Sequence, residues 1–304
     1  MAGAGREPSD ATRIVDTTSR PLKVLTPDQV ERYVRDGFLS VESLVDDAWL
    51  ERLRAVTREF IDKARALETS NFIFDLEPDH TEAQPRLRRL TSPADLHETY
   101  WEFASQSAIV DVVEDLLGPD IKFHHSKLNF KAPRGGEEVK WHQDIQFWPH
   151  TNYGPLTVGV FLEDVRPSMG NVGFLPGSHR GELFDQYDGP EWRGCISESE
   201  VATLDLERAV FPTGRAGTIT VHNCRTVHGS APNLSTQERP LLLQTYAPAD
   251  AFTYTDLVKR SPRGDSLIRG QPATWARHDP RPCQVGPSRV RTIFEVQQGE
   301  TGGG

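Results

Sequence analysis

His142, Asp144 and His228 are the residues whose types and spacing most directly suggest chemistry in this chain. Two imidazoles and one carboxylate on one face of an octahedral ion leave neighbouring coordination positions open, an arrangement that suits Fe(II) and the binding of O₂. Because His142 and Asp144 are two residues apart, a strand would direct both side chains to the same side. His228 must then arrive from a distant strand to complete the set.

A histidine two residues before an acid is a weak motif alone, because ten histidines and 44 acidic residues make it expected about once by chance. A second copy, His80-Thr81-Glu82, lies among prolines and acids without apolar alternation, and we predict a solvated loop there. The copy at His142 differs, because apolar runs at 120–130 and 156–162 flank it. A further strand-like segment at 217–222 leads to the distal histidine, so these segments predict strands around a barrel mouth.

Three blocks occur in order along the chain: Trp141-His142-Gln143-Asp144, then Phe174-Leu175-Pro176-Gly177-Ser178-His179, then His228-Gly229-Ser230 followed by Asn233, Ser235 and Arg239. Together they resemble the phytanoyl-CoA dioxygenase family of Fe(II)/2-oxoglutarate-dependent oxygenases, which also contains ectoine hydroxylase. The resemblance runs from about Leu25 to Tyr254, and three ordered blocks are far more specific than any one of them. It implies Fe(II), 2-oxoglutarate and O₂ as cofactor and co-substrates.

The resemblance also implies roles for matching positions. His142, Asp144 and His228 match the family's iron ligands, and Arg239 matches its anchor for 2-oxoglutarate. A guanidinium group binds a carboxylate through two parallel charge-assisted hydrogen bonds, which independently supports this role for Arg239. A lysine would bind less specifically. Ser230 lies two residues after His228, so its hydroxyl is a second candidate donor to the same carboxylate, with the capping of a turn as the alternative.

The segment 126–131 alternates polar and apolar residues, which predicts a strand with one core face and one cavity face. The resemblance places this strand beside 2-oxoglutarate, so Lys127 and Asn129 on its polar face are candidate contacts. Lys131 shares that face but lies near a glycine turn, and we expect it to be solvated. Phe161 matches a bulky family position beside the co-substrate, although plain core packing is an equally ordinary role for such an aromatic residue.

Four further histidines have simpler interpretations. His222 lies six residues before His228, a separation that does not place both on one side in any simple way, so we predict a buried, hydrogen-bonded core residue. His179 follows a tight turn and is expected to anchor that turn by hydrogen bonding. His124 and His125 are adjacent, so a regular strand would direct them to opposite faces.

Length, charge and cysteine content fit a single cytoplasmic enzyme. The chain has 304 residues, 37% of them hydrophobic, and a net charge of −10, which argues against broad nucleic-acid binding. It shows neither an apolar run long enough for a membrane span nor a secretory signal. Its three widely spaced cysteines fit reduced thiols better than a disulfide framework. We therefore expect a cytoplasmic protein, either a monomer or a homodimer.

The order of predicted elements favours one domain between two flexible tails. The tails are residues 1–20 and 296–304, which are polar or rich in small residues. Residues 21–295 are predicted to form a single oxygenase domain. Its helical part is expected at about 26–118 and its mainly β core, a cupin-like double-stranded β-helix or jelly roll, at about 120–295.

Helix signals are clear in the first of these parts. One helix is predicted to begin at Pro27 and to end at Gly37, and a second to follow Asp46. Another pair is predicted within 92–117, where glycine and proline then stop it. About eight strands should follow. The irregular stretch 181–211 is assigned to an insertion that covers the mouth of the barrel.

The resemblance implies a reaction in which 2-oxoglutarate is converted to succinate and CO₂ while a C–H bond of a small metabolite or natural-product intermediate is hydroxylated. Asp144 favours hydroxylation over halogenation, because halogenating relatives replace this acid with a small residue. Desaturation, epimerisation and rearrangement also occur in the family, so the outcome stays open. The alternative is a non-catalytic jelly roll that binds a metal or 2-oxoglutarate. A protein that binds only a metal would not need a carboxylate anchor, so the presence of Arg239 and Ser230 argues against this alternative.

The substrate itself is not readable from the sequence. Phe147, Trp148 and Tyr153 follow the iron motif and form either an apolar wall or packing beneath a lid. Lysines and an arginine near Lys127 give a local positive charge, which suits an anionic substrate or 2-oxoglutarate alone. A small molecule remains the expected partner, since no larger basic surface for a coenzyme A thioester is evident.

Overall fold

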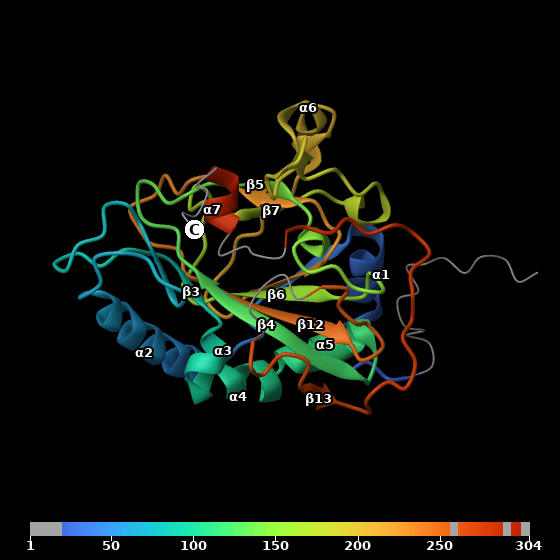
Figure 1. Ribbon diagram of the computed structural model, residues 1–304. Coiled ribbons are helices and arrows are strands. Elements are labelled where there is room, and N and C mark those ends of the chain that lie inside the picture. Colours follow the sequence, from blue (N-terminus) through green and yellow to red (C-terminus); the bar gives the residue numbers. More distant parts are fainter. Residues whose placement is uncertain (1–19, 256–260, 288–292, 299–304) are drawn as a thin grey trace, which may run out of the picture.

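The computed structural model describes residues 20–255, 261–287 and 293–298, and within them two β-sheets face each other (Figure 1). The large sheet has eight strands: in spatial order β1 (Phe38–Val41), β10 (Ile219–Asn223), β6 (Leu156–Phe161), β12 (Leu241–Pro248), β4 (Ile121–Asn129), β3 (Leu87–Thr91) and β2 (Phe74–Leu76), with β13 (Leu267–Arg269) beside β4. The smaller sheet contains β5 (Val139–His142), β11 (His228–Ser230) and β7 (Val172–Phe174), in that order. All of these strands pair antiparallel. The predicted jelly-roll core is confirmed.

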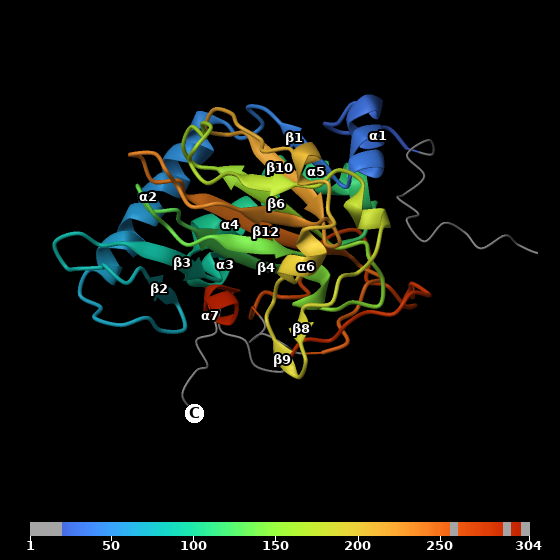
Figure 2. The same ribbon diagram turned by 90° about the horizontal axis from the view of Figure 1, so that it is seen from above.

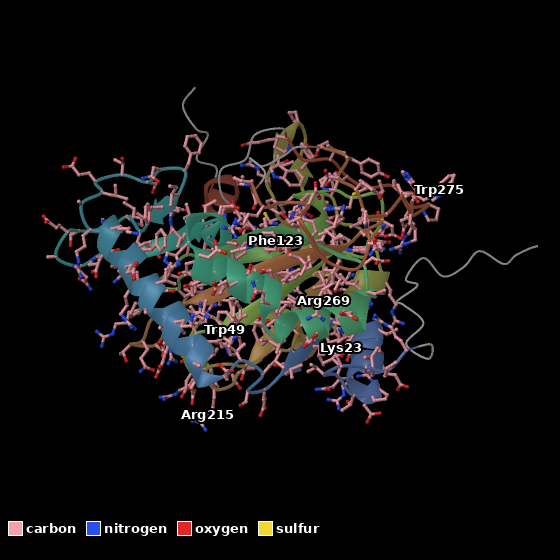
Figure 3. All side chains as sticks on the ribbon, turned by 90° about the horizontal axis from the view of Figure 1, so that it is seen from below. Lys23, Trp49, Phe123, Arg215, Arg269 and Trp275 are labelled. Carbon is pink, nitrogen blue, oxygen red and sulfur yellow. The ribbon has the colours of Figure 1, made fainter. Side chains whose placement is uncertain are left out.

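Helices cover the outer face of the large sheet, as Figure 3 shows from below. On this face lie α2 (Asp47–Ala64), α3 (Pro93–Leu96), α4 (Glu98–Gln106) and α5 (Ile109–Leu117), and α1 (Pro27–Asp36) lies beside β1. The other two described α-helices, α6 (Glu198–Val201) and α7 (Ile293–Gln298), lie on the side of the smaller sheet. Trp49 of α2 packs edge to face on Phe103 of α4, with ring centroids 5.3 Å apart. None of the described helices is both long enough and apolar enough to cross a membrane.

Alternation along β6 explains why one sheet face becomes core and the other faces a cavity. Leu156, Val158 and Val160 are fully buried in the main hydrophobic core with the helices. Thr157 and Phe161 are on the opposite face, toward the smaller sheet, because successive strand residues point to opposite sides. The large sheet therefore provides both a packed wall and the floor of a site.

The first two helix predictions are confirmed. Thr26 caps α1 in a capping box with Gln29, and Asp46 caps α2. Gly37 ends α1 with a φ of +81°, and a Cβ atom there would stand 2.3 Å from Nδ1 of His179. Only glycine meets both conditions, the left-handed backbone and the close approach.

Two predictions about residues 92–117 and earlier were wrong in detail. The stretch holds three helices instead of a pair, because His97 adopts an extended conformation between α3 and α4. The part predicted to be helical also supplies β1, β2 and β3 to the large sheet. These strands have three to five residues, too few to show a period along the sequence.

The stretch 181–211 contributes no strand to either of the two facing sheets, as predicted, although Val210 makes a single bridge to Phe174 of β7. It forms a two-stranded hairpin of β8 (Tyr187–Asp188) and β9 (Glu191–Trp192), and then α6, which projects beyond the smaller sheet (Figures 1 and 2). The predicted tails lie largely outside the described residues, except that the last three residues of α7 belong to the segment 296–304. All three cysteines are free thiols, in agreement with the prediction.

Glu77, directly after β2, is a buried acid that makes stability depend on pH. Burial raises its pKa from 4.5 to about 7, although the Arg88 cation opposes this. The folded state then binds a proton more tightly than the unfolded state, so its contribution to stability falls as pH rises from about 4.5 to about 7. We expect Glu77→Gln to raise the free energy of unfolding by about 1–2 kcal/mol at pH 8 and by much less at pH 5. Urea denaturation at both pH values measures this, and an equal gain at both would contradict it.

Candidate metal centre

The two sheets bring the three candidate metal ligands together at one point. His142 ends β5 and His228 begins β11, and these two residues are directly opposite each other in the antiparallel pair. Their imidazole centroids are 4.1 Å apart. Asp144 begins a short 3-10 turn, Asp144–Gln146, one residue after the end of β5, so the expectation that His142 and Asp144 share a strand was wrong in detail. The turn nevertheless returns the carboxylate to the side of the histidines.

The donor atoms are spaced as one ion requires. Asp144 Oδ1 lies 3.7 Å from His142 Nε2 and 4.0 Å from His228 Nε2. Ligand atoms about 2.0–2.2 Å from one metal ion lie roughly 3–4 Å from each other. All three side chains are buried, and their ligand atoms lie within 4.8 Å of one another. The residues therefore fit a single divalent ion.

Backbone hydrogen bonds hold both imidazoles in the form that binds metals. His142 Nδ1 lies 2.9 Å from the carbonyl oxygen of Lys140, and His228 Nδ1 lies 2.9 Å from that of Thr226. A carbonyl only accepts, so each Nδ1 carries the hydrogen and donates it. Each Nε2 lone pair is then free to face the ion, which is the usual outer arrangement around metal-bound histidines.

Electrostatics favour the protonation states in which Asp144 and His228 bind a metal ion. Burial alone would raise the pKa of Asp144, but the Lys127 cation and the contacts from His142 and His222 lower it well below its usual range. Burial, with the neighbouring imidazoles of His142 and His222, lowers the pKa of His228. An ionised carboxylate and a neutral imidazole are the species that bind metals.

His222 proves to be part of this centre. It is buried, as predicted, but its Nε2 lies 3.3 Å from Asp144 Oδ2, and its ring centroid lies 4.5 Å from that of His228. Thr157 donates its hydroxyl to the same oxygen at 3.4 Å. Asp144 Oδ1 thus faces the Nε2 atoms of His142 and His228, while Asp144 Oδ2 is held by His222 and Thr157. His222 is therefore a buried, hydrogen-bonded residue, as predicted, but its partner is a candidate metal ligand, which the prediction did not include.

This geometry predicts a specific effect for His222→Ala. Loss of an outer partner that orients a ligand typically costs about 10–100-fold in metal affinity, so we expect that decrease with the stoichiometry still at one metal per chain. Calorimetric titration with Co(II) measures both values. His179→Ala is the matched control, because that buried imidazole binds the carbonyl of Val34, 3.1 Å away, outside the centre. Equal affinity losses in the two variants would indicate general destabilisation.

A cavity of about 60 Å³ adjoins the three donors. Its lining includes the polar residues Arg89, Lys127, Asn129, Thr157, Ser230 and Arg239 and the apolar residues Val172, Leu241, Leu243, Ile293 and Phe294. Arg239 is 3% exposed, and its Nε donates to the carbonyl of Met169 at 3.2 Å. Burial lowers the pKa of Arg239 to about 10, which still leaves the guanidinium charged at neutral pH. Ser230 belongs to β11 and not to a turn, so its capping alternative was wrong.

The segment 126–131 was predicted as a strand, but β4 ends at Asn129; its polar residues nevertheless reach the cavity. Lys127 and Asn129 line it, as predicted. Lys131 also lines it but is 2% exposed, so the expectation of a solvated position was wrong. Its amino group donates to the carbonyl oxygens of Glu137, Ser230 and Ala231, which ties the strand to the end of β11.

Phe161 does not line this cavity. It packs with Val165 and with Leu241, a residue that does line the cavity. Its predicted role beside the co-substrate stays a prediction. Phe147, Trp148 and Tyr153 do not line the cavity either; Phe147 contacts the ring of His142 edge to face, at 5.7 Å between centroids.

The predictions for four other histidines can be compared with their local geometry. A register shift in the pairing of β12 with β4 lets His124 and His125 turn toward each other, with their Nδ1 atoms 2.6 Å apart, so the expectation of opposite faces was wrong. His179 hydrogen-bonds as predicted, but to α1. His80-Thr81-Glu82 is a loop, as predicted.

The sequence did not point to two groups that border the cavity. Ile293 and Phe294 come from α7, a six-residue helix far along the chain. Arg89 comes from β3 and donates to the side chain of Asn129 at 3.1 Å. The register of β3 with β4 places Arg89 directly opposite Asn129, a long-range pairing that local spacing does not reveal.

A jelly roll with two histidines and a carboxylate at its open end defines a class of metal-dependent oxygenases. The model of the family described as Phytanoyl-CoA dioxygenase matches residues 33–241, more than half of the chain, and the chain belongs to this family.

Individual proteins agree with this assignment. The chain is 35% identical over 261 residues to a probable alpha-ketoglutarate-dependent hypophosphite dioxygenase of Stutzerimonas stutzeri, covering 85% of this chain and 91% of that protein. It is 26% identical to an ectoine dioxygenase of Sphingopyxis alaskensis, covering 81% and 83%. The crystal structure of EctD from S. alaskensis with 2-oxoglutarate and 5-hydroxyectoine superposes with a TM-score of 0.64, at 24% identity and 88% coverage of both chains. That last likeness concerns the fold alone.

Proposed function

We propose that this protein is an Fe(II)/2-oxoglutarate-dependent dioxygenase that oxidises a small molecule and releases succinate and CO₂. In this proposal His142, Asp144 and His228 bind the iron, and Arg239 with Ser230 binds the far carboxylate of 2-oxoglutarate. The observation that carries it is the presence, in one buried cavity, of three correctly spaced metal donors and a charged arginine.

The residues divide the work in a simple way. Iron, when bound, supplies the activation of O₂, and one oxygen atom enters succinate while the other enters the substrate. Arg239 holds the co-substrate in one orientation, because its fork matches a carboxylate. Lys127 and Asn129, on the neighbouring strand β4 of the same sheet, are also proposed to contact 2-oxoglutarate. Leu241 and Leu243 of β12, paired with Asn129 and Lys127, add apolar surface to the same floor of the cavity, which excludes water and strengthens each charged contact.

Hydroxylation of a C–H bond in a small metabolite is the main proposal for the reaction. Oxidation of a small oxyanion is the second candidate, favoured by the 35% identity to the probable hypophosphite dioxygenase and by a small cavity that Arg89 and Lys127 make positive. With hypophosphite, the inserted oxygen atom would convert a P–H bond to P–OH and yield phosphite. Neither candidate requires a residue beyond those already in the cavity.

Succinate release tests the proposal directly. The Fe(II)-loaded protein is incubated in air with 2-oxoglutarate, ascorbate and single compounds: hypophosphite, ectoine, L-proline and a panel of small metabolites. Proton NMR measures succinate, and phosphorus NMR measures phosphite. Succinate that depends on one compound supports catalysis and identifies the substrate class. Binding of 2-oxoglutarate without succinate under any condition would instead support the non-catalytic alternative.

Several broader features are part of the same proposal. We infer a single oxygenase domain that begins near residue 21 and extends through α7, beyond the predicted end at residue 295, and a cytoplasmic location, with a small molecule as the partner. Acidic overall charge and three free thiols support this setting. Size-exclusion chromatography with light scattering would distinguish a monomer from a homodimer.

A further inference from the structure

The helix α7 lies between β3, the strand next to the edge strand β2 of the large sheet, and β5 of the smaller sheet (Figures 1 and 2). Two of its residues, Ile293 and Phe294, line the same cavity as the metal donors and Arg239. No part of the insertion at 181–211 lines that cavity. Within the described residues, α7 is therefore the element that closes this side of the site.

Phe294 is firmly seated there. Its side chain is buried, although α7 has only six residues. Its ring centroid lies 5.7 Å from the guanidinium carbon of Arg88 and 6.0 Å from that of Arg89. These are distances at which a cation is attracted to the face of an aromatic ring. Arg89 also lines the cavity, so Phe294 sits beside one of its charged walls.

Gln297 fixes α7 to the strand that carries a metal ligand. Its side-chain oxygen accepts a hydrogen bond from the backbone N–H of Lys140 at 2.8 Å, and its side-chain nitrogen donates to the carbonyl of Gly194 at 2.8 Å. The carbonyl of the same Lys140 accepts the hydrogen bond from His142 Nδ1. One residue of β5 thus connects α7 on one side with a candidate iron ligand on the other.

The space under α7 is too small for both molecules that the reaction needs. A cavity of about 60 Å³ holds roughly five water-sized groups, since one water requires about 10–15 Å³ of such space. Bound 2-oxoglutarate, a chain of five carbon atoms with two carboxylates, would fill most of this space by itself. A substrate beside it must therefore be small or must displace Phe294.

We propose that α7 is a roof of the active site and that Phe294 determines how large a molecule the site accepts. This inference rests on the proposed function, because it assumes that 2-oxoglutarate binds at Arg239. Gln297 acts as a positioning residue, which holds the roof through Lys140. The substrate class is accordingly a compact molecule, and removal of the aromatic ring should admit larger ones.

Two competitors of 2-oxoglutarate with different sizes test this without knowledge of the substrate. N-oxalylglycine has the same chain length as 2-oxoglutarate, whereas pyridine-2,4-dicarboxylate carries a rigid ring. Their dissociation constants are measured by calorimetry on the full-length Co(II)-loaded protein, for wild type, Phe294→Ala and Gln297→Ala. Trp275→Ala is the control, because that side chain is 85% exposed and does not line the cavity.

We expect the ring compound to bind about tenfold more tightly to Phe294→Ala and Gln297→Ala, the lower limit for relieving a steric conflict in a pocket. N-oxalylglycine should change less than about twofold, and the control should match wild type. Hydrogen exchange of residues 293–298 should accelerate in Gln297→Ala, while that of α5 stays the same.

Other outcomes would overturn the proposal in distinguishable ways. Unchanged affinity for the ring compound in both variants, or equal weakening of both compounds, would show that α7 does not limit size. If wild type binds neither compound, the 2-oxoglutarate proposal fails, and the role of α7 fails with it. Gln297→Ala retains the buried phenyl ring, so it keeps the test decisive if Phe294→Ala does not fold.

Discussion

Asp144→Ala is expected to abolish substrate oxidation and to weaken metal binding strongly. The carboxylate is the one anionic donor among the three candidate ligands, and without it two neutral imidazoles face a doubly charged ion. Changes behind a ligand typically cost about 10–100-fold in affinity or activity, so loss of the ligand itself should exceed about 100-fold. The substitution also removes the acceptor of the hydrogen bonds from His222 and Thr157.

Two measurements check this expectation together. Bound Fe(II) is measured by colorimetric assay after anaerobic loading and gel filtration, and succinate is measured by NMR with and without substrate. Asp188→Ala is the matched control, because the Asp188 carboxylate is mainly solvent-exposed in β8. If Asp144→Ala retained full iron and produced succinate at the wild-type rate, the assignment of the metal centre would be wrong. A melting temperature near that of the control confirms that the variant is folded.

The three candidate ligands and Arg239 were predictable because each belongs to a short block whose residue types are demanded by chemistry. An Fe(II) site of this kind uses histidine and acid donors, and two-pronged binding of a carboxylate favours an arginine. The order of the three sequence blocks along the chain then indicates which block supplies the first two metal ligands and which supplies the distal histidine and the arginine. The strand between residues 126 and 131 was predictable for a different reason, since polar and apolar residues alternate with the period of a strand.

His222 could not be recognised in this way. It belongs to β10 of the large sheet, whereas His228 belongs to β11 of the smaller sheet, so the chain crosses between sheets in the five residues that separate them. The two rings meet across the sandwich. Spacing rules describe neighbours on one element, and they do not apply to a crossover. A buried histidine close to a motif is the one signal in the sequence that could have raised the question.

Lys131 and α7 escaped prediction because tertiary contacts decide both. A lysine is ordinarily solvated, but three backbone carbonyls receive the amino group of Lys131 and replace its water. The helix α7 is shorter than an isolated helix needs to be, so its packing against β5 and the burial of Phe294 stabilise it. Neither the burial of Lys131 nor the packing of α7 produces a recognisable pattern in the neighbouring sequence.

Arg239→Ala is expected to raise the dissociation constant of 2-oxoglutarate by about 100-fold or more, while iron still binds with unchanged stoichiometry. Two hydrogen bonds to a charged group contribute about 1.5–3 kcal/mol each, and a difference of about 1.4 kcal/mol is a factor of ten. The guanidinium is buried beside the carbonyl of Met169, so water does not readily replace it. Saturating 2-oxoglutarate should restore much of kcat, since Arg239 lies outside the set of metal donors.

Arg239→Lys separates charge from shape in the same experiment. Lysine keeps the positive charge but has no planar fork, so its affinity for 2-oxoglutarate should lie between those of wild type and Arg239→Ala. Calorimetric titration of 2-oxoglutarate into anaerobic Fe(II)-loaded protein gives all three values. If the three proteins bound 2-oxoglutarate equally, the carboxylate would have another anchor in the cavity. If none bound it while iron was present, the chain would be a metal-binding jelly roll without this co-substrate, and the proposed reaction would fail.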